Sequence, residues 1–184
     1  MDSPCFKTSR LTLTPLELGD ATAIQQLFPS WEVVRYLDSR VPWPYPDDGA
    51  LSYVRDIALP AIAAGREWHW MIRVGGPQAP CIGSISLYDQ PGNHRGFWLA
   101  PQWQGNGYIR EACQVVNAFW FDTLARPLMQ VPKALDNVAS RRVSEHEGMR
   151  KTGTAEGRFV CGPMLKELWE LSREEWLARR PTGR

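Results

Sequence analysis

Two glycines separated by one residue, Gly105 and Gly107, lie between a short apolar segment at 96–100 and a run with helical spacing that begins at Gly107. Glycines allow a backbone to approach a ligand closely, and the free amides at the start of a helix point outward as hydrogen-bond donors. The stretch therefore predicts a strand, an anion-binding loop and a helix in succession, which is an α/β arrangement.

Two common phosphate-binding motifs do not match this loop. A Walker A loop carries Lys and then Ser or Thr after its second glycine, whereas Tyr108 and Ile109 follow here. A dinucleotide-binding fingerprint needs a third glycine, and Arg110 occupies that position. The loop alone predicts a phosphate or pyrophosphate ligand without saying which molecule carries it.

The remaining pattern mixes strands and helices along the whole chain. Strands are predicted at 10–16, 67–74, 81–88, 96–100, 128–135, 149–154 and 164–171. Helices are predicted at 19–28, 31–37, 50–65, from 107, at 137–148 and from 172. No repeat or linker interrupts this order, so a single mixed α/β domain over residues 1–184 is expected.

Several residues mark the ends and irregularities of these elements. Asp20, Asp47 or Asp48, and Asn137 are predicted to cap helices, and Pro60 predicts a kink or a break. Pro132 has no amide hydrogen to donate, so its strand is predicted to be unpaired on one side at that point.

Composition narrows the class of partner and the compartment. A net charge of +1 gives no broad attraction for nucleic acid or for membranes, and neither is expected as a partner. The four cysteines lie far apart, so neither a metal site nor a disulfide framework is predicted. The first residues lack an apolar signal core and no apolar run could span a bilayer, which favours the cytoplasm.

Two separate motifs carry a resemblance to a known family. Gln102, Gly105 and Gly107 match the (Gln/Arg)-x-x-Gly-x-(Gly/Ala) acyl-CoA signature of GNAT N-acetyltransferases. The surrounding run, GFWLAPQWQGNGYIREA, resembles the ribosomal-protein N-terminal (alanine and serine) acetyltransferase branch. DNVASRRVSEHEGMRKTGT resembles the Asn-x-x-Ser…Gly-Phe segment of that branch, with Met149 where Phe is usual. The first and last segments are similar too, so the resemblance runs nearly end to end.

The resemblance implies a mixed, mostly antiparallel sheet, flanked by helices and splayed between the strands at 96–100 and 128–135. Acetyl-CoA would lie in the split as co-substrate, with its pyrophosphate on the loop amides and its pantetheine arm between the strands. The implied binding residues are Leu99, Ala100, Gln102, Gln104, Gly105, Asn106, Gly107, Tyr108, Asn137 and Ser140. Asn137 can serve as a helix cap at the same time.

The implied activity is acetyl transfer to a primary amine by direct attack in a ternary complex, without a metal. Many family members place a Tyr where this chain has Ser144, so Ser140 is the first candidate acid and Ser144 the second. A serine hydroxyl more plausibly donates a hydrogen bond than a full proton. Alternation along 67–74 puts Glu67 and His69 on one face, and either is a candidate base. Asp89 and His94 are loop alternatives.

In this family the segment between the first helices forms one wall of the acceptor site. Here it contributes Asp38, Trp43 and Tyr45, although the two aromatic rings could equally fasten the loop to the core. A protein N-terminus and a small-molecule amine both fit this wall. A non-catalytic acyl-CoA-binding or sensing domain is the alternative function, a nucleotide-binding module is a weaker one, and either a monomer or a homodimer is compatible with the sequence.

Overall fold

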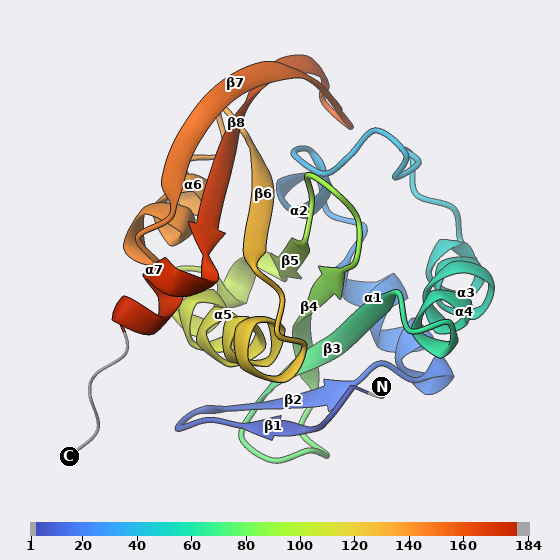
Figure 1. Cartoon of the computed structure of the whole chain (residues 1–184). Helices are drawn as coiled ribbons and strands as arrows, with labels where there is room; N and C mark the ends of the chain where they lie inside the picture. Colours follow the sequence, from blue (N-terminus) through green and yellow to red (C-terminus); the bar gives the residue numbers. More distant parts are fainter. Residues whose placement is uncertain (1–2, 180–184) are drawn as a thin grey trace.

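The computed structural model describes residues 3–179, in which the strands form two antiparallel sheets (Figure 1). The first sheet has the order β1-β2-β3-β4-β5, with β1 (Phe6–Lys7), β2 (Leu11–Pro15), β3 (Glu67–Val74), β4 (Cys81–Tyr88) and β5 (Arg95–Leu99). The second has the order β6-β8-β7, with β6 (Leu128–Ala134), β7 (Arg150–Phe159) and β8 (Gly162–Ser172). The predicted fold class is confirmed, and β7 and β8 form a longer hairpin than predicted.

Helices lie on both sides of the first sheet (Figure 1). The α-helices are α1 (Ala21–Leu27), α2 (Trp31–Val34), α3 (Gly49–Tyr53), α4 (Leu59–Ala63), α5 (Tyr108–Ala118), α6 (Val138–His146) and α7 (Arg173–Ala178). A π-helical turn, Val54–Ala58, joins α3 to α4, and a second one, Phe119–Thr123, extends α5. Short 3₁₀ turns, Leu18–Asp20 and Pro101–Trp103, precede α1 and the glycine loop.

Two hydrophobic cores form on the two faces of the first sheet because β3 alternates its side chains. Trp68, Trp70 and Ile72 pack with Val116 and other α5 residues in one core. Met71 belongs to the other core, together with residues of α1 and of the segment from α3 to α4. The predicted alternation of the strand at 67–74 is therefore confirmed.

The two sheets meet at the edge strands β5 and β6 and then separate. The His94 amide donates to the Gln130 carbonyl oxygen, and the Gln130 amide donates to His94 Nδ1, both at 2.8 Å. Backbone groups alternate sides along a strand, so those of Pro132, two residues beyond Gln130, face β5 as well. Pro132 pairs only with Leu168 of β8, and its missing amide hydrogen lies where a ladder to β5 would continue. The predicted one-sided pairing is confirmed.

The helix ends correct some predictions and confirm others. The predicted helix at 50–65 is interrupted by the π-helical turn, and Pro60 lies in the first turn of α4. Asp20 and Asp48 are the N-cap residues of α1 and α3, as predicted, but neither side chain bonds to an amide of that helix. The Asp20 carboxylate accepts from the Glu17 amide and pairs with Arg73, and the Ala50 amide donates to the side chain of Gln25. The N-cap at Asn137 and the Ser172 capping box at the start of α7 are confirmed.

Candidate functional site

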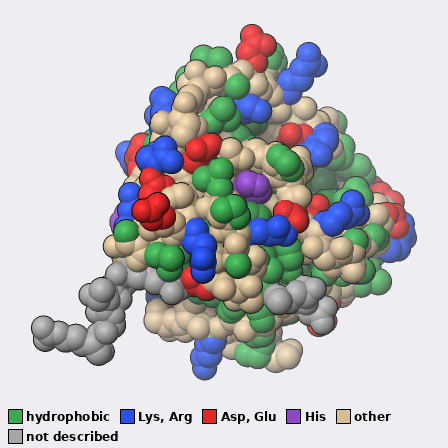
Figure 2. Space-filling view, viewed as in Figure 1, with side chains coloured by type: hydrophobic (Ala, Val, Ile, Leu, Met, Phe, Trp, Pro, Cys, Tyr) green, Lys and Arg blue, Asp and Glu red, His purple; other side chains and the backbone are tan. Residues whose placement is uncertain are grey.

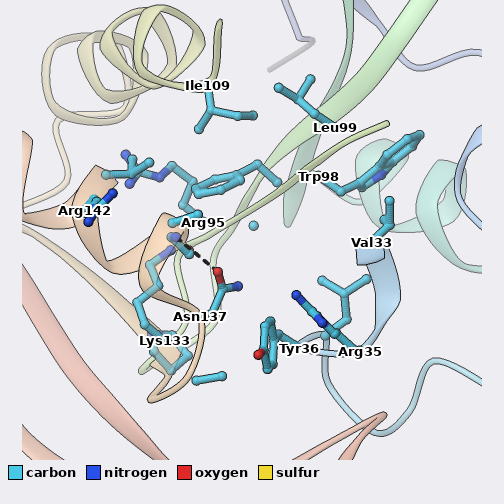
Figure 3. A pocket seen from close by; sticks show the side chains of 18 of the residues that line it. Val33, Arg35, Tyr36, Arg95, Trp98, Leu99, Ile109, Lys133, Asn137 and Arg142 are labelled. Atoms are coloured by element: carbon cyan, nitrogen blue, oxygen red, sulfur yellow. Dashed lines mark hydrogen bonds between the residues drawn. The ribbon is translucent and has the colours of Figure 1, made fainter. Parts of the chain in front are cut away.

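A cavity of about 700 Å³ lies where the two sheets separate. Its walls are β5, the start of α5 with the preceding loop, β6, α6, the segment 32–38 and residues 157–159. Figure 3 shows Lys133 and Asn137 on one side of this space and Val33, Arg35 and Tyr36 on another. Strands far apart in the sequence therefore contribute to one site, because the edges of β5 and β6 are not paired beyond His94 and Gln130.

The glycine loop contributes a row of free backbone donors to this cavity. Gly105 and Gly107 have φ angles of +79° and +77°, in the left-handed region that glycine adopts without strain. The amides of 105–110 donate no backbone hydrogen bond within the described chain, whereas the Glu111 amide already bonds to the Gly107 carbonyl oxygen. Gly107 is the N-cap residue of α5, so these donors lie at the positive end of an 11-residue helix.

Side chains of the loop itself hold its shape. Gln104 Nε2 donates to the Leu99 carbonyl oxygen at 3.0 Å, and Asn106 Nδ2 donates to the carbonyl oxygens of Trp103 and Gln104 at 3.2 and 3.1 Å. The side chains of Gln104 and Asn106 therefore brace the backbone.

An ionic brace beside the loop was not predicted from the sequence. Glu111 accepts from the hydroxyls of Thr8 and Ser9 and from the amide and side chain of Arg10, and Arg10 Nη1 donates to the Asn106 carbonyl oxygen at 2.9 Å. Despite burial, these hydrogen bonds lower the pKa of Glu111 to about 2. The turn between β1 and β2 thus fixes the loop from a distance of about 100 positions in the sequence, which no local pattern indicates.

Helix α6 forms the wall opposite the loop. Asn137 Oδ1 accepts from the Ser140 amide at 3.1 Å, so the cap is also a lining residue (Figure 3). Ser140 lines the cavity, whereas Ser144 does not. Ser144 Oγ is buried and has no hydrogen-bond partner among the described residues. The structure separates the two candidate serines, and Ser140 is the one that a ligand in the cavity could contact.

A buried polar cluster joins three of the walls. Arg95 of β5 is fully buried and its two terminal nitrogens bond to the Glu147 carboxylate at 2.7 and 2.6 Å. Asn117 of α5 accepts from Arg95 Nη1 at 2.5 Å and donates to Glu147 Oε1 at 2.9 Å. The cluster fixes β5, α5 and the end of α6 relative to one another.

Lys133 of β6 is a lining residue that the sequence did not single out. It is 6% exposed, and its ammonium lies 4.6 Å from the centre of the Phe97 ring on β5. Burial, and then the neighbouring charge of Arg95, lower the pKa of Lys133 to about 8. A lysine on a strand face otherwise occupied by Met129 and Val131 was the signal that could have drawn attention to it.

Glu67 and His69 lie outside the lining of this cavity. Glu67 Oε2 is 2.7 Å from His69 Nε2, and Ser86 Oγ is 2.8 Å from His69 Nδ1. Both ring nitrogens of His69 are therefore engaged, and the ring is buried between Tyr53 and Tyr88. The Ser86 hydroxyl is buried too, so this Ser–His–Glu arrangement offers no accessible nucleophile. Glu67, a quarter exposed, is its solvent-facing end.

Of the three residues predicted for the acceptor wall, only Asp38 lines the cavity. Asp38 lines the cavity and forms an ion pair with Arg40 at 2.8 Å, and hydrogen bonds from Arg40 lower the pKa of Asp38 against the effect of its partial burial. Trp43 and Tyr45 do not line the cavity. Trp43 packs on Trp31, and Tyr45 packs on Phe28 of the second core, which is the structural role left open above.

Three predicted binding residues differ from the rest in how they are placed. Gln102 is exposed and, like Asn106, lies outside the cavity lining. The Ala100 amide donates to the Ile82 carbonyl oxygen at 2.9 Å and is not available to a ligand. By the alternation of a strand, the backbone groups of Leu99 and Phe97 face the gap instead. Of the predicted set, Leu99, Gln104, Gly105, Gly107, Tyr108, Asn137 and Ser140 line the cavity.

Charge in the cavity differs from charge on the surface. Figure 2 shows basic and acidic side chains interspersed over the visible face of the molecule. The cavity lining includes Arg35, Arg110, Lys133, Arg142, Arg158 and Lys166 but only Glu32 and Asp38 as acids outside the Arg95 cluster. Among residues 3–179 no group of acidic, His and Cys side chains could hold a metal, and no helix there could cross a bilayer. The excess of basic residues in the lining suits an extended ligand that carries several negative charges.

Comparison with protein families gives one match across most of the chain. The family described as acetyltransferase (GNAT) domain matches residues 10–150. A Bacillus subtilis (strain 168) protein, YdaF, provisionally named a ribosomal N-acetyltransferase, is 29% identical over 100 residues. That match covers 51% of this chain and 55% of YdaF, so the chain spans about half the length of this relative.

Solved structures share the whole fold. The ribosomal-protein-S5-alanine acetyltransferase of Vibrio fischeri superposes with a TM-score of 0.78 at 16% identity, over 97% of this chain and 100% of that one. The ribosomal L7/L12 α-N-protein acetyltransferase RimL, in complex with coenzyme A, gives 0.79 at 16% identity over 94% and 99%. Mycobacterium smegmatis RimJ, in complex with a CoA disulfide, gives 0.76 at 16% identity over 90% and 83%.

Proposed function

The chain belongs to the GNAT acetyltransferase family, and from that premise we propose that it is an acetyl-CoA-dependent N-acetyltransferase that acts on a primary amine. The observation that carries the proposal is the row of free amides at 105–110, at the head of α5 and open to a cationic cavity. A pyrophosphate needs such donors, and a helix N-terminus favours its charge.

The gap between β5 and β6 is the proposed position of the pantetheine arm. It begins beside the glycine loop and runs between two strand edges that are not paired with each other beyond His94 and Gln130. The backbone groups of Leu99 and Phe97 face it, and an amide-containing arm can bond to them as a neighbouring strand would. Asn137 and Ser140 line the other side. The residues present therefore fit an acyl-CoA.

The proposed reaction is direct attack of a neutral amine on the thioester. Ser140 is the proposed donor toward the sulfur, since it lines the cavity and its hydroxyl has no hydrogen-bond partner among the described side chains. Ser140→Ala should therefore lower kcat, while Ser144→Ala should not, because Ser144 is absent from the cavity lining. Equal losses in both variants would contradict this assignment.

Glu67 is the proposed base, with His69 holding its carboxylate. It lies on β3, two strands from the β5 edge, which corresponds to roughly 10 Å. At that distance the proton would travel through water rather than by direct contact. A Glu67→Gln and His69→Ala pair that kept the wild-type pH–rate profile would remove Glu67 from the mechanism.

The proposed acceptor is a protein N-terminus, in the cytoplasm. Support comes from the ribosomal proteins named for YdaF, RimL and the Vibrio fischeri enzyme, and from Asp38, whose carboxylate lines the cavity and suits a cationic amine. Thiol release from acetyl-CoA, measured with N-terminal peptides and with small amines in parallel, tests the acceptor class. Tight acetyl-CoA binding without turnover on any acceptor would favour a sensing domain instead.

The pyrophosphate site has a matched pair of variants. Gly105 and Gly92 have φ angles of +79° and +80°, and a Cβ at either would meet no atom within 4 Å. Gly105→Ala and Gly92→Ala therefore carry the same backbone strain, but only Gly105 lies in the loop. Isothermal titration with CoA should show weaker binding for Gly105→Ala alone. Equal affinities in the two folded variants would refute the loop assignment.

A further inference from the structure

Lys133 combines burial with the absence of any partner for its charge. No hydrogen bond or ion pair joins its ammonium to a described residue, and the ammonium lies 4.6 Å from the centre of the Phe97 ring. Lysine side chains are almost never buried to this extent unless they are paired. An ammonium in this position is therefore expected to meet a group that enters the cavity from outside the chain.

Carboxylates of the chain do not serve as that group. Glu147, the carboxylate whose charge acts on Lys133, is already held by two nitrogens of Arg95 and by Asn117. Arg95 and Glu147 offset each other, so the positive charge of Lys133 remains uncompensated. Cys113 of α5, the other titratable neighbour, is fully buried, and burial raises the pKa of its thiol to about 12.

The position of Lys133 along the gap indicates which part of an acyl-CoA it would meet. The two strands are joined at His94 and Gln130, and Phe97 and Lys133 lie three residues further along each. Their contact therefore crosses the gap partway along it from the closed end at His94 and Gln130. The glycine loop lies at the opposite end, after Leu99. A pyrophosphate at the loop directs the far, sulfur end of the pantetheine arm toward Lys133.

We propose that Lys133 is a catalytic residue whose ammonium stabilises the CoA thiolate as it leaves. This inference rests on the proposed function. The amine nitrogen forms a bond to the acetyl carbon, the C–S bond breaks, and its electron pair remains on sulfur as a thiolate beside Lys133. The amine loses its surplus proton to the base, and Lys133 keeps its own. A cation in a water-poor site is worth more to a developing anion than it would be in solvent.

The test measures the thiol of bound CoA directly, without an acceptor. The ultraviolet absorbance of the thiolate gives the pKa of the thiol in complexes with the wild type, Lys133→Met and Lys133→Arg. The thiol pKa should be lower in the wild type than in Lys133→Met by at least about one unit, and Lys133→Arg should retain most of that difference. Lys7→Met, an exposed lysine on β1, should behave as the wild type.

The outcomes separate this inference from the proposed function. Equal thiol pKa values in the wild type and Lys133→Met, with CoA bound to both, would overturn the role of Lys133. They would not contradict the proposed acetyltransferase function. Failure of the wild type to bind CoA at all overturns both. Desulfo-CoA, which lacks the sulfur, should bind the wild type and Lys133→Met with similar affinity. A several-fold loss of desulfo-CoA binding in Lys133→Met would mean that Lys133 serves another part of the ligand. If Lys133→Met does not fold, Lys133→Gln carries the same comparison.

Discussion

Removing Arg95 tests how the walls of the cavity are held together. Arg95→Met keeps an unbranched apolar stem but leaves the Glu147 carboxylate, only 10% exposed, without its two charged hydrogen bonds. Breaking a buried ion pair by removing one partner costs about 3 to 5 kcal/mol. For a chain of 184 residues this corresponds to a decrease in Tm of roughly 6 to 20 °C. Asn117 would also lose a hydrogen bond at 2.5 Å.

Two further variants make the measurement specific. Arg55→Met removes an ion pair of similar length, Arg55–Asp56 at 2.7 Å, in which both side chains are about half exposed, and should change the unfolding free energy by less than about 1 kcal/mol. Arg95→Met combined with Glu147→Leu should recover much of the loss, because no uncompensated charge then remains buried. Urea unfolding followed by circular dichroism gives each value. A loss below about 1 kcal/mol for Arg95→Met would refute the reasoning.

Other predictions concern the loop, a strand contact and the α6 cap. The pKa of Glu111 is about 2 in the folded protein against 4.5 ordinarily. Its contribution to the free energy of unfolding is therefore present above pH 4.5 and is lost as the pH falls toward 2. Acid titration of the wild type should show a loss of about 3 kcal/mol in unfolding free energy that Glu111→Gln lacks. Gly83→Ala would bring a Cβ into the carbonyl oxygen of Trp98 on the paired strand, and thermal melts should show a destabilisation of about 2 to 3 kcal/mol. Asn137→Ala should cost about 1 kcal/mol by loss of the cap, whereas Asn137→Asp, which keeps an accepting oxygen, should lose far less in the same melts.

Local signals in the sequence predicted much of the fold. The alternation of 67–74, the strand–loop–helix order at Gly105 and Gly107, the cap at Asn137 and the one-sided pairing at Pro132 each depend on a few neighbouring residues, and each is confirmed. Asp20 and Asp48 do occupy the predicted N-cap positions, but without side-chain cap hydrogen bonds. Asp20 pairs with the distant Arg73, and the Ala50 amide donates to Gln25.

The parts of the site that were missed depend on contacts between distant segments. Arg10 and Glu111 are joined across about 100 positions, and Arg95 and Glu147 across about 50. Neither pair has a spacing that a helix or strand period would indicate. The local signal for Lys133, its place on a strand face with Met129 and Val131, is weak, because a lysine in a sequence is ordinarily read as exposed. The resemblance to GNAT enzymes supplied the location of the cavity, but it did not supply these contacts.

Pro132 also sets a limit on how stable this protein can be. A residue with an amide hydrogen at that position would allow β5 and β6 to continue their pairing beyond Gln130, and the two sheets would become one. The same change would close the gap that leads from the glycine loop to Lys133. A screen for thermostability should therefore favour such a substitution, and a screen for acetyl transfer should reject it.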